Sequence, residues 1–61
     1  MTASVKVILL DRRAELVAAR AQSVALATMP GNTASNVLRE LRNIASYESE
    51  LGAISTLLLE A

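Results

Sequence analysis

The sequence predicts an all-α fold: an antiparallel hairpin of two long helices that dimerises into a four-helix bundle, with one domain covering residues 1–61. Three observations support this fold class. The single proline and one of the two glycines are adjacent at the centre of the 61-residue chain. Apolar residues recur at alternating spacings of three and four in both flanking arms, which is the spacing of an amphipathic helix. The two apolar series also come into register when the arms fold back on each other.

The central segment Met29–Thr33 is predicted to be the turn of the hairpin. Pro30 has no backbone N–H and a fixed φ, so a helix arriving from the N-terminal side should end before it. Gly31 can adopt the positive φ that a helix stop or turn often requires. Asn32 or Thr33 can cap the next helix with a side-chain oxygen. The predicted elements are a first helix over about 3–28, a turn over 29–33 and a second helix over about 34–60.

Each arm is expected to pack through one apolar seam with the 3-4 repeat of a coiled coil. In the first arm the seam residues are Ala3, Val7, Leu10, Ala14, Val17, Ala21, Val24 and Thr28. Leu9 and Leu16 flank this seam and widen it. In the second arm the seam residues are Ala34, Val37, Leu41, Ile44, Glu48, Leu51, Ser55 and Leu58.

Folding the arms about Pro30 and Gly31 brings position n to about position 61 − n. One row of the two seams then pairs Leu10 with Leu51, Val17 with Ile44 and Val24 with Val37. The alternate row, whose numbers add to 62, pairs Val7 with Ser55, Ala14 with Glu48 and Ala21 with Leu41. Turn, arm lengths and seams agree, as expected of a sequence that specifies one fold.

The opening segment 4–10 has a second interpretation, because its β-branched residues and partial alternation also suit a short strand. The order would then be strand, helix, turn, helix, with Gly31-Asn32-Thr33-Ala34-Ser35 before the last helix. In that order of elements the chain resembles the ribbon-helix-helix repressors and antitoxins. The resemblance implies a dimer whose paired strands enter the DNA major groove, with Ser4, Lys6 and Ile8 facing the bases. It covers the topology without a specific motif, and only Lys6 of these three is basic.

The composition leaves little chemistry available to the chain. It contains no cysteine and no histidine, which removes disulfides, thiolate zinc sites and the commonest general base. It also has no glycine-rich phosphate loop. We therefore expect no enzyme activity, no cofactor and no metal site. A chain of this size buries only about 60% of its unfolded surface, so association with another subunit is the expected source of further stability.

The net charge is zero, but the two arms differ in sign. The first arm carries four cations and two anions, a net +2, and the second carries two cations and four anions, a net −2. Arms of opposite charge attract weakly when they lie side by side. No segment suits a signal peptide or a membrane span, since the apolar run Leu51–Leu59 is too short to cross a bilayer. The expected location is the cytoplasm.

The open end of the hairpin, opposite the turn, is the predicted oligomer or partner interface. More apolar side chains gather there than one neighbouring helix can cover, and large exposed apolar patches are rare on soluble monomers. A homodimer in the form of a four-helix bundle is the simplest solution, and another protein is the alternative partner. The predicted interface consists of Val5, Val7, Ile8, Leu9, Leu10, Tyr47, Leu51, Ile54, Leu57, Leu58 and Leu59.

The charged residues offer a second set of candidates. Lys6, Arg13 and Arg20 are seven apart and line one face of the first helix over about 21 Å. They could follow nucleic-acid phosphates or dock an anionic partner, or they could form a solvated outer face. Glu48 falls on the predicted seam, either as a buried or register-setting carboxylate or at a frayed edge, where it reaches solvent or Arg13. Asp11 and Glu15 are interpreted as surface charge.

These observations favour a small non-enzymatic protein–protein interaction module, such as an adaptor, an inhibitor or a small regulatory protein. A dimeric DNA-binding transcriptional regulator or antitoxin of ribbon-helix-helix type is the alternative. An RNA-binding hairpin that uses the basic residues of the first helix is the third hypothesis.

Overall fold

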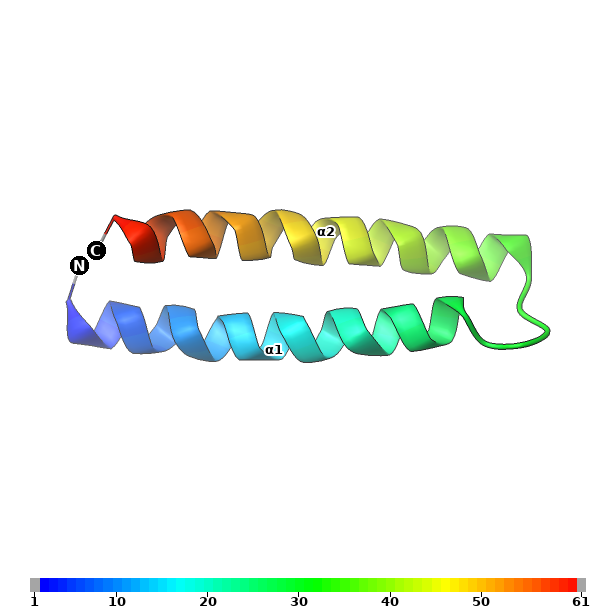
Figure 1. Ribbon diagram of the computed structural model, residues 1–61, viewed down its shortest axis with the longest axis horizontal. Helices are drawn as coiled ribbons and strands as arrows, with labels where there is room; N and C mark the ends of the chain where they lie inside the picture. The colour runs from blue at the N-terminus through cyan, green and yellow to red at the C-terminus, as the bar shows by residue number, and fades with distance from the viewer. Residues whose placement is uncertain (1, 61) are drawn as a thin grey trace.

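The computed structural model describes residues 2–60 as two long helices joined by a short turn. Helix α1 spans Ala3–Ala27 and helix α2 spans Ala34–Leu59. The helices run antiparallel and pack against each other, with the start of α1 and the end of α2 at the end opposite the turn (Figure 1). The hairpin is narrow, measuring 46 × 14 × 11 Å between Cα atoms. The predicted two-helix hairpin is therefore confirmed. Neither helix is long and apolar enough to span a membrane.

The N-terminal segment belongs to α1, so the strand interpretation of residues 4–10 is wrong. Thr2 caps the helix: its Oγ1 accepts a hydrogen bond from the Val5 N–H at 3.3 Å, and its carbonyl accepts one from the Lys6 N–H at 3.1 Å. A capped first turn favours helix over the β preference of Val5, Val7 and Ile8. Without a strand among the residues described, the ribbon-helix-helix order of elements is lost.

The turn forms as its residue types predict. Met29 to Asn32 is a β-turn closed by a hydrogen bond from the Asn32 N–H to the Met29 carbonyl at 3.3 Å. Gly31 has φ +78°, which with Pro30 before it corresponds to a type II turn. The Asn32 side-chain amide donates to the last-turn carbonyl of Leu26 at 2.8 Å. Thr33 is the residue that caps α2, accepting from the Asn36 N–H at 3.2 Å.

The two glycines should respond oppositely to alanine. Gly31→Ala is expected to destabilise the hairpin by about 1 kcal/mol, because a Cβ is strained at positive φ. Gly52→Ala is expected to stabilise it by up to about 1 kcal/mol, because Gly52 is helical and an added Cβ meets nothing within 4 Å. Urea unfolding at low micromolar protein checks both. Equal shifts in the same direction would contradict the turn geometry.

The packing surface of α1 differs from the predicted seam. The buried residues of α1 are Leu16 and Ser23, and Leu9, Ala19 and Ala27 are half-buried. All eight residues of the predicted seam, from Ala3 to Thr28, are exposed. At 100° per residue, the two stripes are about 140° apart around the helix. The flanking residues Leu9 and Leu16 thus make the contact with α2, and the predicted seam faces away from it.

The packing surface of α2 agrees with one row of the prediction. Val37, Ile44, Leu51 and Leu58 are half-buried, as expected for seam residues. The other row is displaced by one residue, because Leu41, Glu48 and Ser55 are exposed and the row Glu40, Tyr47 and Ile54 lies against α1 instead. Tyr47 and Ile54 bury far more apolar surface than Glu48 and Ser55 would. That gain explains the displacement, which also takes Glu40 inside.

The contact between the two helices therefore contains polar residues. Glu40 and Ser23 are each 5% exposed, similar to the apolar core residues Leu16 and Ile54 at 2% and 4%. The numbers 23 and 40 add to 63, which lies between the sums for the two inter-helix ion pairs, 62 for Arg12–Glu50 and 68 for Arg20–Glu48, so Ser23 and Glu40 lie at about the same level. The Glu40 carboxylate is 3.5 Å from the guanidinium of Arg39. The buried carboxylate is Glu40, eight residues before the glutamate placed on the predicted seam.

Candidate interaction surfaces

About half of the predicted open-end interface is buried or half-buried in the contact between α1 and α2. Ile54 is buried between the helices, and Leu9, Tyr47, Leu51 and Leu58 are half-buried along the same contact. The remaining residues of that set are exposed: Val5, Val7, Ile8, Leu10, Leu57 and Leu59. These six do not form one surface, because helical geometry separates them. Ile8 and Val7, for example, point about 100° apart.

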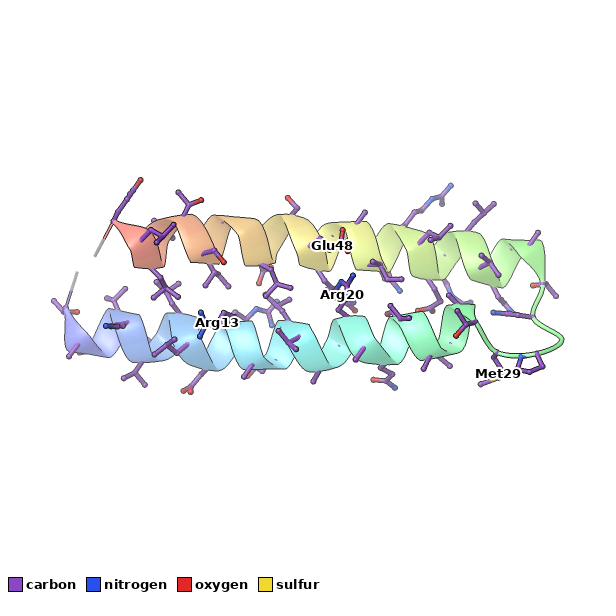
Figure 2. All side chains as sticks on the ribbon, viewed as in Figure 1. Arg13, Arg20, Met29 and Glu48 are labelled. Carbon is purple, nitrogen blue, oxygen red and sulfur yellow. The ribbon has the colours of Figure 1, made fainter. Side chains whose placement is uncertain are left out.

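The predicted basic stripe is partly neutralised within the chain. Arg20 reaches across to α2, where its Nη2 lies 2.9 Å from Oε1 of Glu48 (Figure 2). Glu48 is thus exposed and paired with Arg20, where the sequence suggested solvent or Arg13. Within residues 2–60, Lys6 and Arg13 have no ion-pair partner. The stripe is therefore two free cations and one paired cation along α1.

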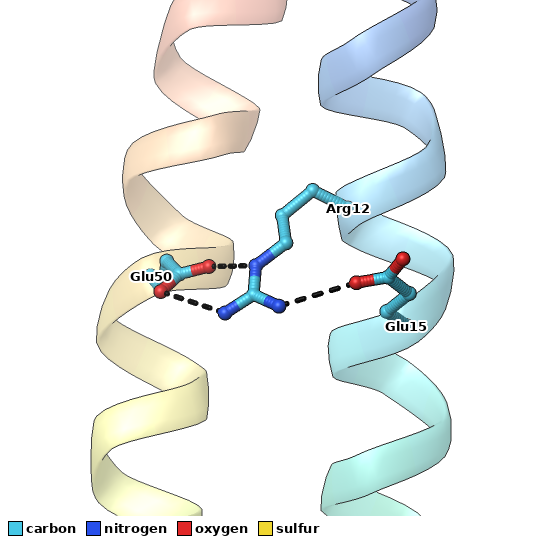
Figure 3. Close-up of polar contacts among 3 residues, drawn as sticks. All are labelled: Arg12, Glu15 and Glu50. Carbon is cyan, nitrogen blue, oxygen red and sulfur yellow. Dashed lines mark hydrogen bonds and ion pairs between the residues drawn. The ribbon is translucent and has the colours of Figure 1, made fainter.

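A second inter-helix ion pair lies nearer the open end. The Arg12 guanidinium makes a two-pronged contact with Glu50, with Nε 2.6 Å from Oε2 and Nη2 3.4 Å from Oε1 (Figure 3). Its Nη1 also lies 3.2 Å from Oε2 of Glu15 on the same helix. The hydrogen bond from Arg12 lowers the pKa of Glu50 below its ordinary value of 4.5, and the bond to Glu50 raises the pKa of Arg12. Glu15 is exposed, as predicted for a surface charge, and it is also bonded to Arg12.

This ion pair predicts a loss of stability in acid. The Glu50 pKa is lower in the folded state than in the unfolded chain, so its contribution is complete above pH 4.5 and disappears as the pH falls through the folded-state value. The thermal midpoint should therefore fall between pH 6 and about pH 2.5, modestly because the pair is exposed. Arg12→Gln should reduce that fall. An identical acid profile in the variant would contradict the linkage.

The two ion pairs mark opposite faces of the hairpin. Arg12 and Arg20 stand four residues before and after Leu16, about 40° to either side of the buried direction of α1. On α2, Glu50 and Glu48 likewise lie on opposite sides of the buried direction. We call the side with the Arg20–Glu48 pair the Arg20 face. The other side carries Arg12, Glu15, Glu50 and Arg39.

The Arg20 face is the more apolar of the two, with four large exposed apolar side chains against Ile8, Leu26 and Leu57 on the other. Val17 and Val24 lie within about 60° of Arg20 around α1, and Leu10, two turns before Val17, lies about 80° from Arg20. On α2, Leu41 is seven residues before Glu48 and points the same way. All four of these large apolar side chains are exposed. Sequence periodicity identified them correctly as one stripe but placed them between the helices, whereas the structure leaves them on the surface.

The residues described by the structure enclose no pocket and contain no group of three or more acidic, histidine or cysteine ligands arranged to hold a metal ion. The surfaces that remain are therefore the outer faces of the two helices. Comparison of the chain with protein-family models, curated proteins and solved structures finds no match in any of the three.

Proposed function

We propose that the chain is a small non-enzymatic protein–protein interaction module that acts as an oligomerising helical hairpin. The observation that carries this proposal is the number of large apolar side chains left outside the helix contact. They are distributed along both halves of the chain, from Val5 to Met29 in the first half and from Leu38 to Leu59 in the second. Extended exposed apolar surface on a small folded chain marks a site for another protein.

The total surface area supports the same conclusion. The hairpin exposes 4395 Å², whereas a compact monomer of 6.5 kDa would expose about 3,800 Å². The excess follows from the shape, because two helices bury only one stripe each. Such a fold gains stability when further helices cover the outer stripes. Adaptor, inhibitor and small regulator are roles in which a surface of this kind suffices without chemistry.

The charged groups favour a protein partner over nucleic acid. Arg12 and Arg20 bond to glutamates across the hairpin, and Arg39 lies beside Glu40. Phosphate binding depends on cations that are available to neutralise phosphates, and its affinity grows with their number. In the part of the chain described, Lys6, Arg13 and Arg42 are the side-chain cations outside these pairs, and Arg42 is on the other helix.

Light scattering coupled to size exclusion, over about 1 to 200 µM protein, tests the proposal because association follows mass action. The expected result is a mass that rises from 6.5 kDa towards an integral multiple of it as the concentration increases. The helix signal in circular dichroism should be high throughout. A well-folded chain that stays at 6.5 kDa over the whole range would contradict the proposed self-association.

A further inference from the structure

The Arg20 face is a candidate binding surface, and the inference about what binds there rests on the proposed function. We propose that a second copy of the chain docks on this face with both turns at the same end of the bundle. In that arrangement a twofold axis runs parallel to the helices. Each α1 then packs antiparallel against α2 of the other copy, and both helices bury the outer stripe that the hairpin leaves exposed.

Large and small residues alternate along the outer stripes of α1 and α2. In a same-end dimer, residues at equal height on α1 and on the other copy's α2 have numbers that add to between 62 and 68, the values of the Arg12–Glu50 and Arg20–Glu48 pairs within the hairpin. At the lower value a large side chain meets a small one at three levels: Leu41 meets Ala21, Val17 meets Ala45 and Leu10 meets Gly52, whereas Val24 meets Leu38. Alternation of large and small residues across facing positions lets two helices interdigitate. The stripes face away from the hairpin seam, so they fit each other only between copies.

The charges distinguish the same-end arrangement from its alternative. With the turns at opposite ends, a face-to-face twofold dimer places α1 over α1 and α2 over α2. That arrangement sets a net +2 against +2 and −2 against −2. With the turns at the same end, each +2 arm lies over a −2 arm. Complementary charge across an interface selects the orientation, and juxtaposed like charges oppose it.

The surface area of the hairpin leaves room for a dimer interface of standard size. Two separate hairpins each expose 4395 Å², and a compact particle of twice the mass would expose about 6,300 Å². The difference, about 2,400 Å², is an upper limit because the bundle is elongated, yet it exceeds the roughly 1,600 Å² of a standard protein interface. An interface of standard size therefore fits within the area that pairing of two hairpins can bury.

Paired charge substitutions on opposite sides of α1 test which face is used. Val17 is on the Arg20 face and Ile8 is on the other, and both are more than half exposed, so neither change disturbs the helix contact. Val17→Glu places a carboxylate opposite the acidic α2 of the second copy and should raise the dimer dissociation constant about 100-fold or more. Ile8→Glu, the matched control, should leave it within about threefold. Sedimentation of both variants, with helix content verified by circular dichroism, gives the comparison.

The orientation is tested by distance. The chain has no cysteine, and Met29 is an exposed turn residue (Figure 2), so Met29→Cys accepts a single spin label. In the same-end dimer the two labels should lie within about 20 Å, whereas opposite-end packing separates them by about 40 Å, the length of a helix. A mixed dimer of Met29→Cys and Ser4→Cys protomers should give the longer distance.

The possible failures are distinguishable. A wild-type chain that remains monomeric would overturn the proposed self-association and this dimer with it. A dimer that survives Val17→Glu but not Ile8→Glu would leave the proposed function standing and place the interface on the other face. A dimer sensitive to Val17→Glu whose turn labels are about 40 Å apart would overturn the orientation alone.

Discussion

Leu16→Ala is expected to unfold the hairpin. Leu16 is the most deeply buried side chain of the described residues, at 2% exposure, and lies at the middle of α1 against α2. Truncating a buried leucine removes about 3 kcal/mol through lost burial and the cavity that remains. A single small core rarely supplies more than about 3 to 5 kcal/mol in total. Circular dichroism at low micromolar protein should therefore show most of the helix signal lost at 37 °C.

A matched control separates burial from the mere removal of an aliphatic side chain. Ile8→Ala deletes a side chain of similar size from the same helix, at a position that is 64% exposed. Its effect on the free energy of unfolding should stay within about 0.5 kcal/mol. If the two variants were equally stable, the seam through Leu9, Leu16 and Ser23 would be incorrect, and the 3-4 stripe predicted from the sequence would become the better candidate for the helix contact.

The turn and the helix bounds could be predicted because local chemistry decides them. Pro30 cannot continue a helix, Gly31 accepts the positive φ, and the Thr33 hydroxyl accepts a backbone N–H. None of these effects depends on which face of a helix is buried. The observed helices Ala3–Ala27 and Ala34–Leu59 consequently match the predicted spans to within one residue at each end.

The packed face of α1 could not be predicted from periodicity, because α1 has two apolar stripes. The regular 3-4 stripe through Val7, Leu10 and Val17 satisfies the coiled-coil repeat better than the observed contact does. The observed contact uses Leu9 and Leu16, which are larger than the alanines of the regular stripe, and it allows Arg12 and Arg20 to reach Glu50 and Glu48. Burial size and inter-helix ion pairs are properties of the assembled pair of helices, and repeat spacing contains neither.

The buried glutamate could not be found for the same reason. Glu40 precedes Leu41, and an isolated amphipathic helix would place the leucine inside. The orientation of α2 about its own axis is determined by residues after Glu40, because Tyr47 and Ile54 bury more surface than Glu48 and Ser55 would. Glu40 is seven residues before Tyr47 and fourteen before Ile54, so it lies on the same face of α2. When Tyr47 and Ile54 are turned towards α1, Glu40 is therefore buried with them. Only a comparison of whole rows could have indicated it.

Glu40→Leu is therefore expected to stabilise the hairpin by about 1 to 3 kcal/mol. Replacing a buried charged group by a well-packed apolar one of similar size commonly raises stability, because the charge no longer has to leave water. The contact that compensates Glu40 is a 3.5 Å approach of the exposed Arg39, which is weaker than a direct two-pronged bond. The urea midpoint should rise, and Ser46→Leu, which adds a leucine at an exposed position of α2, should leave it nearly unchanged.

The same variant tests whether the polar level formed by Glu40 and Ser23 selects the helix register. A polar group in a helix contact can exclude alternative registers at the expense of stability. If it does so here, Glu40→Leu will be more stable but less uniquely packed, with broadened amide resonances around Ala19 and Ile44 at unchanged helix content. Sharp resonances with higher stability would mean that the apolar rows alone define the register. A variant less stable than the wild type would show that the carboxylate makes a net favourable contribution at its buried position.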